Sequence, residues 1–336
     1  MNILFTCAGR RTYLLKYFKE NMQPGDKVVA TDMQLSAPAL QVADVKLQVP
    51  AVYDSKYIDI TLDICKEHHI DALISLNDLE LPILAGQKAR FEDLRVKVIV
   101  SDPQVIDICF DKYKTALWVS ELGLSAPKTY IRLDDAKAAL ASGEICFPLF
   151  LKPRWGSGSI GLETVGDMEE LEIVYGLLFK KIKKTILATA SVGDEYIMIQ
   201  EKLTGKEFGL DVMNDLEGNN VAVSVKQKLA MRAGETDKAS TVDLPEVRKM
   251  GGIIGRNLKH IGNLDVDIMQ RVNGDYCVLE LNPRFGGGFP FSYEAGVNLP
   301  KAIMMWLRGE KVEASLLQPE FGRMYAKNDY LMEIKV

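Results

Sequence analysis

The sequence predicts an α/β protein, in which a parallel sheet covered by helices is followed by a region of helices and antiparallel strands. Over the first hundred residues, short apolar runs alternate with helical patterns, which is typical of parallel βαβ units. Beyond residue 190 apolar strands dominate, and Asn273-Gly274 separates the last two of them. This dipeptide is typical of a two-residue hairpin turn, so the second region is expected to be antiparallel.

The elements of the first region follow from the spacing of apolar residues. Strands are expected at 2–8, 27–31, 72–75 and 96–100, and amphipathic helices at 12–21, 57–68 and 82–91. The loops at 7–11 and 77–80 follow strands and would lie at the carboxyl edge of the sheet, where open α/β sheets bind ligands. The sequence has no GxGxxG after the first strand, which argues against a dinucleotide-dependent dehydrogenase.

The second region is expected to begin with a helical stretch from Pro103 to about Leu122, which Gly123 and Pro127 end. Its other expected elements are an apolar run at 145–151, a Gly/Ser loop at 156–161, a helix at 171–190, strands at 196–200, 209–212, 221–225, 265–269 and 276–281, and a helix at 247–260. The segment 234–240 is expected to be a loop.

Composition excludes several classes of function. The chain has 336 residues, 47% of them hydrophobic, and a net charge of −5, so it can build two or three cores but lacks the basic excess of a nucleic-acid binder. No apolar run reaches about 18 residues, the length of a membrane-spanning helix. Five dispersed cysteines and three histidines argue against a disulfide framework, a zinc site and a Ser-His-Asp triad. Any chemistry is expected to use Lys, Arg, Asp, Glu and Asn in a reducing cytoplasm.

Two segments carry the strongest chemical signal. Lys152 ends an apolar strand and precedes the loop GSGSIG at 156–161, where glycines let backbone N–H groups approach phosphate oxygens. A flexible surface loop would give the same Gly/Ser content. Asp267 and Glu280 lie on the two strands of the Asn-Gly hairpin and can share a face with Asn282, which suits Mg²⁺. The alternative is a pair of acidic strand residues that face solvent.

Two further segments give weaker signals. The sequence Gln200-Glu201-Lys202-Leu203, with Glu207 and Asp211 after it, leads from an apolar strand into a polar turn and would also suit a solvated linker. Lys226, Lys228 and Arg232 alternate along a strand and its exit, so they could meet a polyanion. Lysines that protect an edge strand from pairing would read the same way.

Taken in order, these segments resemble the ATP-grasp superfamily, most of all the carbamoyl phosphate synthetase large subunit and its small single-unit relatives. The segment GGGFPFSYEAGVNLP at 286–300 resembles the part of that subunit after its Asn-Pro-Arg. The resemblance implies a Rossmann-like domain at 1–110, followed by two α+β ATP-grasp subdomains that clamp ATP, a lid at 111–199 and a C-terminal subdomain with the Mg²⁺ site at 200–336. The chain has one such unit where the synthetase subunit has two.

The resemblance also implies roles for individual residues. Lys112 and Lys152 are expected at the nucleotide phosphates, and Asp267, Glu280 and Asn282 at one or two Mg²⁺ ions, with Mn²⁺ as a substitute. The other implied ATP-binding residues are Gly156, Ser157, Gly158 and Ser159 in the loop over the phosphates, Glu201, Lys202 and Leu203 at the adenine, and Glu207 at the ribose. Arg284 is expected to face the γ-phosphate and the acyl phosphate, with Lys152 and Lys226 as further catalytic residues.

The expected function is an ATP-dependent carboxylate–amine ligase that forms an amide or peptide-type bond through an acyl phosphate and releases ADP and phosphate. Alternatives are a carboxylate or carbamate kinase and a nucleotide-binding regulatory module without turnover. The substrates are expected to be a small carboxylate and an amine, with no nucleic acid and no membrane, in a possible homodimer. Residues expected to border the acceptor site are Arg10, Asp78, Glu80 and Arg232, although Asp78 could instead cap a helix.

Overall fold

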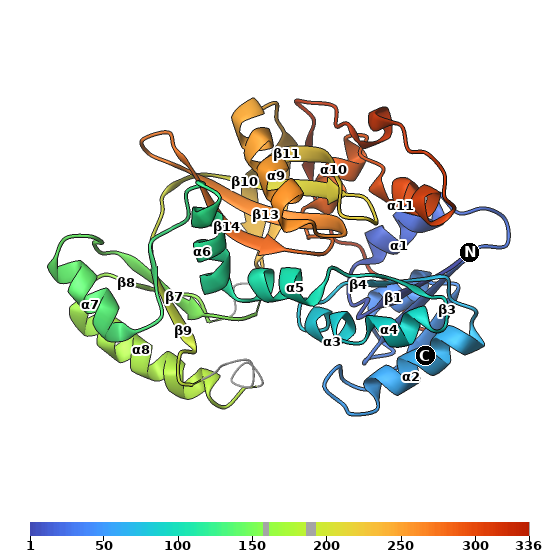
Figure 1. Cartoon of the computed structure of the whole chain (residues 1–336), viewed down its shortest axis with the longest axis horizontal. Helices are drawn as coiled ribbons and strands as arrows, with labels where there is room; N and C mark the ends of the chain where they lie inside the picture. The colour runs from blue at the N-terminus through green and yellow to red at the C-terminus, as the bar shows by residue number, and fades with distance from the viewer. Residues whose placement is uncertain (157–160, 186–192, 336) are drawn as a thin grey trace.

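The structure, a computed structural model, describes residues 1–156, 161–185 and 193–335, and it contains three β-sheets with helices packed against them (Figure 1). A five-stranded parallel sheet comes first along the chain, a four-stranded sheet follows, and a six-stranded antiparallel sheet comes last. The predicted order, a parallel sheet and then antiparallel strands, is therefore confirmed.

The parallel sheet has helices on both faces. It consists of β1 (Asn2–Thr6), β2 (Lys27–Asp32), β3 (Val45–Gln48), β4 (Ala72–Ser75) and β5 (Lys97–Ile99) in the order β3-β2-β1-β4-β5. Side chains of β1 alternate between two cores: Ile3 and Phe5 pack on the side of α1 (Thr12–Lys19), and Leu4 on the side of α2 (Tyr57–Glu67). A strand buried on both faces reads as a continuous apolar run, which is why the sequence identified β1.

Two predicted helices are each two helices in the structure. The segment 82–91 divides into α3 (Leu81–Ala85) and α4 (Lys88–Glu92), because Gly86, a poor helix former, ends the first. The stretch 103–122 divides into α5 (Pro103–Phe110) and α6 (Lys112–Glu121). Asp111 between them has an extended backbone and accepts hydrogen bonds from the N–H groups of Tyr113 and Lys114 as the N-cap of α6.

The four-stranded sheet and its helices lie at the lower left of Figure 1, and we call this part of the chain the lid after the role expected for it. Its strands are β6 (Thr129–Tyr130), β7 (Leu149–Pro153), β8 (Glu163–Val165) and β9 (Ile197–Glu201), in the order β6-β9-β7-β8, and α7 (Leu133–Ala141) and α8 (Met168–Ile182) pack on it. The expected helix at 171–190 is displaced. It begins at Met168 because Asp167 caps it and ends at Ile182, and residues 186–190 lie outside the described residues.

The antiparallel sheet has one apolar and one polar face. It consists of β10 (Gly205–Asn214), β11 (Asn220–Arg232), β12 (Glu235–Thr241), β13 (Gly262–Arg271), β14 (Tyr276–Asn282) and β15 (Met324–Ala326), in the order β14-β13-β10-β11-β12-β15. Phe208, Leu210 and Val212 join the core under α9 (Pro245–Leu258), whereas the residues between them are polar or Gly. The segment 234–240, expected to be a loop, belongs to β12. Its polar composition concealed a strand that begins after the turn at Ala233 and Gly234.

The free edge of β14 is covered by α5 and α6, which pack along it, and by a hydrogen bond from the Val278 N–H to the Ser125 carbonyl (2.8 Å). Beyond β14 the chain forms α10 (Phe289–Glu294) and α11 (Leu299–Leu307) and returns to the first sheet, where Phe285 and Phe289 share a core with Phe5 and Phe18. No helix in the described part of the chain is both long and apolar enough to cross a membrane.

Candidate active site

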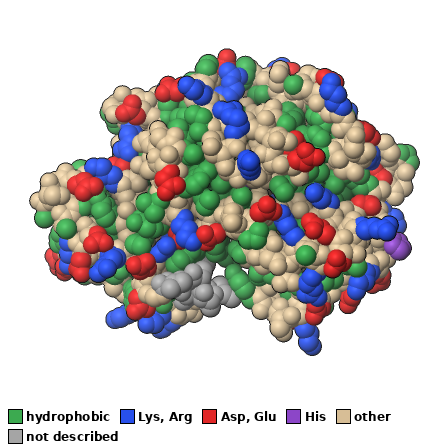
Figure 2. Space-filling view, in the orientation of Figure 1, with side chains coloured by type: hydrophobic (Ala, Val, Ile, Leu, Met, Phe, Trp, Pro, Cys, Tyr) green, Lys and Arg blue, Asp and Glu red, His purple; other side chains and the backbone are tan. Residues whose placement is uncertain are grey.

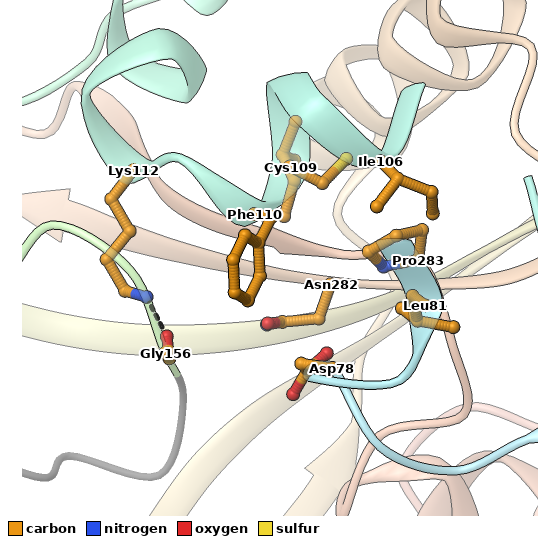
Figure 3. Close-up of a pocket in the computed structure, with 10 residues that line it drawn as sticks. Asp78, Leu81, Ile106, Cys109, Phe110, Lys112, Gly156, Asn282 and Pro283 are labelled. Atoms are coloured by element: carbon orange, nitrogen blue, oxygen red, sulfur yellow. Dashed lines mark hydrogen bonds between the residues drawn. The ribbon is translucent and has the colours of Figure 1, made fainter. Parts of the chain in front are cut away.

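The three sheets meet around a small cavity of about 10 Å³ (Figure 3). Asp78 reaches it from the loop after β4, Leu81 from the start of α3, and Phe110 and Lys112 from the junction of α5 and α6. The remaining lining comes from Ile106 and Cys109 of α5, Gly156 of the lid and residues 281–283 at the end of β14. The space-filling view shows an opening between the lid and the N-terminal part of the molecule (Figure 2).

Lys112 is held at the start of α6 by a buried ion pair. Its neighbour Asp111 accepts two hydrogen bonds from the Arg154 guanidinium, at 2.9 and 2.8 Å, which joins α6 to the end of β7. The Lys112 ammonium donates to the Gly156 carbonyl and lies 3.6 Å from Glu280. Lys112 therefore lies between the lid and β14, and Figure 3 shows its ammonium directed toward Gly156.

Lys152, near the end of the lid strand β7, belongs to the same group of charged side chains as Lys112 and Glu280. Strand alternation buries Leu151 and Pro153 in the lid and leaves Lys152 on the opposite face. Burial lowers the pKa of Lys152 to about 8, an effect that Glu280 and Asp267 oppose and Lys112 reinforces. The side chains of Lys112, Lys152, Asp267 and Glu280 thus influence one another electrostatically.

Asp267 and Glu280 are directly opposite each other on β13 and β14, and Asn282 is opposite Asp265 on the same face. A register shift between Asp267 and Ile268 produces this pairing, because the uninterrupted hairpin register would place Leu279 opposite Asp267. Desolvation raises the pKa of Asp267 to about 6, with further contributions from Asp265 and Glu207, while Lys228 opposes the rise.

These oxygens fit a divalent cation. Two carboxylates and an amide oxygen on one face are hard ligands that suit Mg²⁺, which keeps several waters and shares phosphate oxygens. Among the described residues, no group of three or more His, Cys, Asp and Glu side chains is placed to hold a metal ion. The predicted set, Asp267, Glu280 and Asn282, is of a different kind, with two carboxylates completed by an amide.

The polar face of the sheet holds two lysines in different roles. Lys228 lies 2.7 Å from Asp267 and 2.6 Å from Glu207, so it belongs to the carboxylate cluster. Lys226, expected to be catalytic, is fully buried and pairs with Asp211 at 2.5 Å beneath Gly288. Gly209 opposite Lys226 leaves room for both, because a Cβ there would lie 3.3 Å from each side chain. From the sequence, Lys228 was identified only as one of three basic residues along a strand. Because Lys226 and Lys228 are two residues apart on the same face, their spacing did not show that they have different partners.

Glu207 faces Lys228 rather than solvent, and Glu201 binds Arg271 through two hydrogen bonds of 2.7 and 3.1 Å. Lys202 lies over the Phe150 ring at 5.1 Å. The expected adenine-binding segment 201–203 therefore begins with the last residue of the lid strand β9, beside Arg271 at the end of β13. The expected loop residues Ser157, Gly158 and Ser159 lie outside the described residues, and Gly156 before them accepts the Lys112 hydrogen bond.

Arg284 occupies the opposite end of the site and is buried. Its guanidinium donates to Asp78 and to Asp265, each at 3.0 Å, and its Nε has no partner among the described residues. Burial alone would lower the pKa of Arg284, but the two carboxylates hold it above its usual value. Asp78 therefore neutralises Arg284, and the N-cap position of α3 belongs to Glu80.

The remaining expected acceptor residues are scattered. Glu80 is fully buried and accepts hydrogen bonds from Thr6, Ser75 and Tyr57 at 2.5 to 2.7 Å, so its side chain ties β1 to β4. Arg10 is exposed on the loop after β1. Arg232 is half exposed and pairs with Asp329 and Asp237, away from the cavity lining.

Two sequence families match the chain. The family described as "PylC-like, N-terminal domain" matches residues 3–99, and "ATP-grasp in the biosynthetic pathway with Ter operon" matches residues 194–327. The carbamoyl phosphate synthase large chains of Campylobacter jejuni and Mesorhizobium japonicum are 24% and 26% identical over 65% and 66% of this chain. The chain covers only 20% and 21% of those two proteins.

Solved structures share the fold over nearly the whole chain. The biotin carboxylase domain of Hydrogenobacter thermophilus 2-oxoglutarate carboxylase has a TM-score of 0.75 at 18% identity, with 96% of this chain and 73% of that one covered. An L-amino acid ligase from Bacillus licheniformis has a TM-score of 0.72 at 20% identity, with 96% and 79% covered. The chain therefore has the ATP-grasp fold along nearly its whole length, and its residues 194–327 match an ATP-grasp family.

Proposed function

We propose that this chain is an ATP-dependent carboxylate–amine ligase that works through an acyl phosphate. The observation that carries the proposal is the cluster of Lys112, Lys152 and Lys228 with Asp267 and Glu280, contributed by α6, the lid and the antiparallel sheet. Three cations suit a triphosphate, and the adjacent oxygens suit the divalent cation that accompanies it.

The opposite charges of this cluster pair with each other in the structure. Lys228 holds Asp267 and Glu207, and Lys112 lies beside Glu280. With a nucleotide and Mg²⁺ bound, the lysines would face the phosphates, and Asp267 and Glu280 with Asn282 would hold the ion. When bound, Mg²⁺ supplies charge neutralisation at the phosphate oxygens. Neither ligand alone can balance the cluster, so the nucleotide and the ion are expected to bind together.

The reaction requires positioning and charge rather than a protein nucleophile. A substrate carboxylate oxygen attacks the γ-phosphorus, forming a C–O–P linkage as the bond to the β-phosphate oxygen of ADP breaks. An amine then attacks the acyl carbon, loses a proton and displaces inorganic phosphate. Lys112, Lys152 and Lys228 stabilise the charge on the transferring phosphoryl group. Arg284 is proposed to lie beside the acyl phosphate once a substrate separates it from Asp78.

The finer features of the proposal rest on the family likeness. The three domains are 1–110, 111–199 and 200–336, the ion is Mg²⁺ with Mn²⁺ as a substitute, and one or two ions bind. The protein acts on small molecules in the cytoplasm, as a homodimer. Glu201, Lys202 and Leu203 hold the adenine, Glu207 lies beside the ribose, and Ser157, Gly158 and Ser159 close over the phosphates. Arg10 and Asp78 border the acceptor site, and the buried Glu80 and Lys226 and the distant Arg232 are not assigned to substrate contact.

A phosphate-release screen tests the proposal. The full chain is incubated with ATP, Mg²⁺ and an array of carboxylates, with and without pooled amines. We expect release only when one acid and one amine are both present. Lys152→Ala and Glu280→Ala should lower that rate about 10²–10³-fold, whereas Lys301→Ala on α11 should not change it. Turnover that survives in both site variants would refute the assignment.

The similarity to carbamoyl phosphate synthase large chains favours one alternative, a kinase that stops at the acyl or carboxy phosphate. In that case ADP would form with bicarbonate or one carboxylate and no amine, and hydroxylamine would trap the activated acid. If ATP binds and no mixture turns over, the regulatory alternative is supported and the ligase is refuted for the acids and amines tested.

A further inference from the structure

The structure contains a second concave site, remote from the lysine–carboxylate cluster. A shallow groove of about 380 Å³ lies between α9 and β11. We call it the α9 groove and define it by its lining: Asn220, Ala222, Val223, Pro245, Arg248, Lys249, Gly252 and Arg256. Three of these eight residues are cationic and none is acidic, in a chain whose net charge is −5. The groove is therefore locally positive on an acidic protein.

Two of the three cations are unneutralised. Arg248 donates to Asp243 at 2.6 Å, but Lys249 and Arg256 are exposed and form no ion pair within the described part of the chain. Figure 2 shows basic side chains gathered over α9 on the face turned to the viewer. Because a guanidinium presents a planar fork of donors that matches phosphate oxygens, two arginines beside a lysine suit a phosphate-bearing ligand.

Gly252 gives the groove its floor. The helix α9 contains three glycines, although glycine destabilises the interior of a helix more than any other residue except proline. Close packing explains Gly251 and Gly255, where a Cβ would lie 2.8 Å from Val223 and 2.5 Å from Asn220. A Cβ at Gly252 would instead meet the Arg256 guanidinium, whose nearest atom would lie 3.1 Å away. Gly252 therefore lets Arg256 lie across the helix at the base of the groove.

The groove is separate from the proposed nucleotide site. Val223 and α9 lie on the apolar side of the sheet, whereas Lys228 and Asp267 lie on the polar side. Along β11, Lys228 is the fifth residue after Val223, which corresponds to roughly 17 Å. A ligand in the α9 groove would thus leave the lysine–carboxylate cluster accessible.

We propose that the α9 groove binds a small phosphate-bearing molecule through Arg248, Lys249 and Arg256. Its volume lies within the range of small-molecule sites, about 300–1,000 Å³. Its open, polar lining fits a charged ligand with a solvent-exposed remainder, and binding should weaken as salt is added.

Calorimetric titration of inorganic tripolyphosphate into the full chain, with MgADP saturating the nucleotide site, tests this proposal. We expect one equivalent to bind the wild type and binding to weaken at least tenfold in Lys249→Glu/Arg256→Glu, while the affinity for MgADP stays unchanged. Lys301→Glu reverses an exposed charge on α11 as a matched control and should bind normally.

Gly252→Ala provides a second readout that does not alter charge. Its Cβ should displace Arg256 and weaken tripolyphosphate binding, while the unfolding temperature should not fall because alanine favours the helix. Three results would overturn the proposal: no binding to the wild type at millimolar probe, equal binding by the double variant, or an equal loss in Lys301→Glu, which would indicate only the general field of the protein.

Discussion

The position of Lys152 predicts that nucleotide affinity depends on pH in a specific way. Burial places the pKa of Lys152 near 8, so its ammonium is present at pH 7 and mostly lost at pH 9. The charged form binds phosphates, so affinity should fall as pH rises through about 8. The protonated fraction declines from about nine tenths at pH 7 to about one tenth at pH 9, which corresponds to a roughly tenfold rise in Kd.

The assay is the Kd of MgADP between pH 7 and 9.5, since binding can be measured even where turnover is slow. Lys152→Arg keeps a positive charge over this whole range and should make the Kd almost independent of pH, whatever its absolute value. Lys137→Arg, a change in the lid helix α7, should keep the wild-type dependence. A flat wild-type profile, or a tenfold change that persists in Lys152→Arg, would refute the reasoning.

Three further predictions follow from buried charges. The pKa of Asp267 near 6 means that protons compete with Mg²⁺, so the Mg²⁺ concentration needed for half-maximal ADP binding should rise about tenfold from pH 7 to pH 5, and Asp267→Asn should remove that slope. Lys226→Met leaves the buried Asp211 without its cation, although Ser292 and Asn263 still donate to it, and should cost about 3–5 kcal/mol in denaturant unfolding, most of which Lys226→Met/Asp211→Leu recovers. Burial lowers the pKa of His260 to about 4, so stability should fall by about 3 kcal/mol as pH decreases from 6.5 to 4, and His260→Gln should flatten that fall.

Each of these predictions has a result that contradicts it. A Mg²⁺ requirement that is the same at pH 5 and 7 would place the ion away from Asp267. If Lys226→Met keeps its stability but loses turnover, Lys226 touches substrate and the buried pair is not its role. If His260→Gln loses stability in acid as the wild type does, the loss of stability arises from protonation of carboxylates, since the variant has no imidazole to protonate at this position.

The strands that carry the site were predictable because each has one apolar face and one polar face. In β10 the letters EFGLDV alternate polar or glycine with apolar, so one face suits a core and the other a site. Likewise, the Asn-Gly turn implied that Asp267 and Glu280 lie on neighbouring strands. Strands such as β3 and β12 escaped prediction because they are half-buried or polar and lack that contrast.

The sequence could not predict contacts that depend on the exact register of paired strands or on how deeply a side chain is buried. The shift that places Glu280 rather than Leu279 opposite Asp267 changes no local pattern. Lys226 and Lys228 are the same residue type on the same face of one strand, and the sequence does not show that the loop carrying Gly288 covers Lys226 completely while Lys228 stays with Asp267 and Glu207. The partners of Arg284 lie about 200 and 20 residues away, at Asp78 and Asp265, so three segments must fold before that ion pair exists.

Because α5 and α6 cover the edge of β14, they are expected to protect the protein from aggregation. An uncovered edge strand offers unpaired N–H and C=O groups to any other chain and is a common start of aggregation. Helix α6 carries Lys112 and also protects that edge. Variants that loosen α6, such as Asp111→Ala at its N-cap, should therefore form intermolecular β-structure during expression or mild heating, before the three sheets themselves unfold. Light scattering with an amyloid-sensitive dye would detect this, whereas Lys112→Ala should lose nucleotide binding and remain monodisperse.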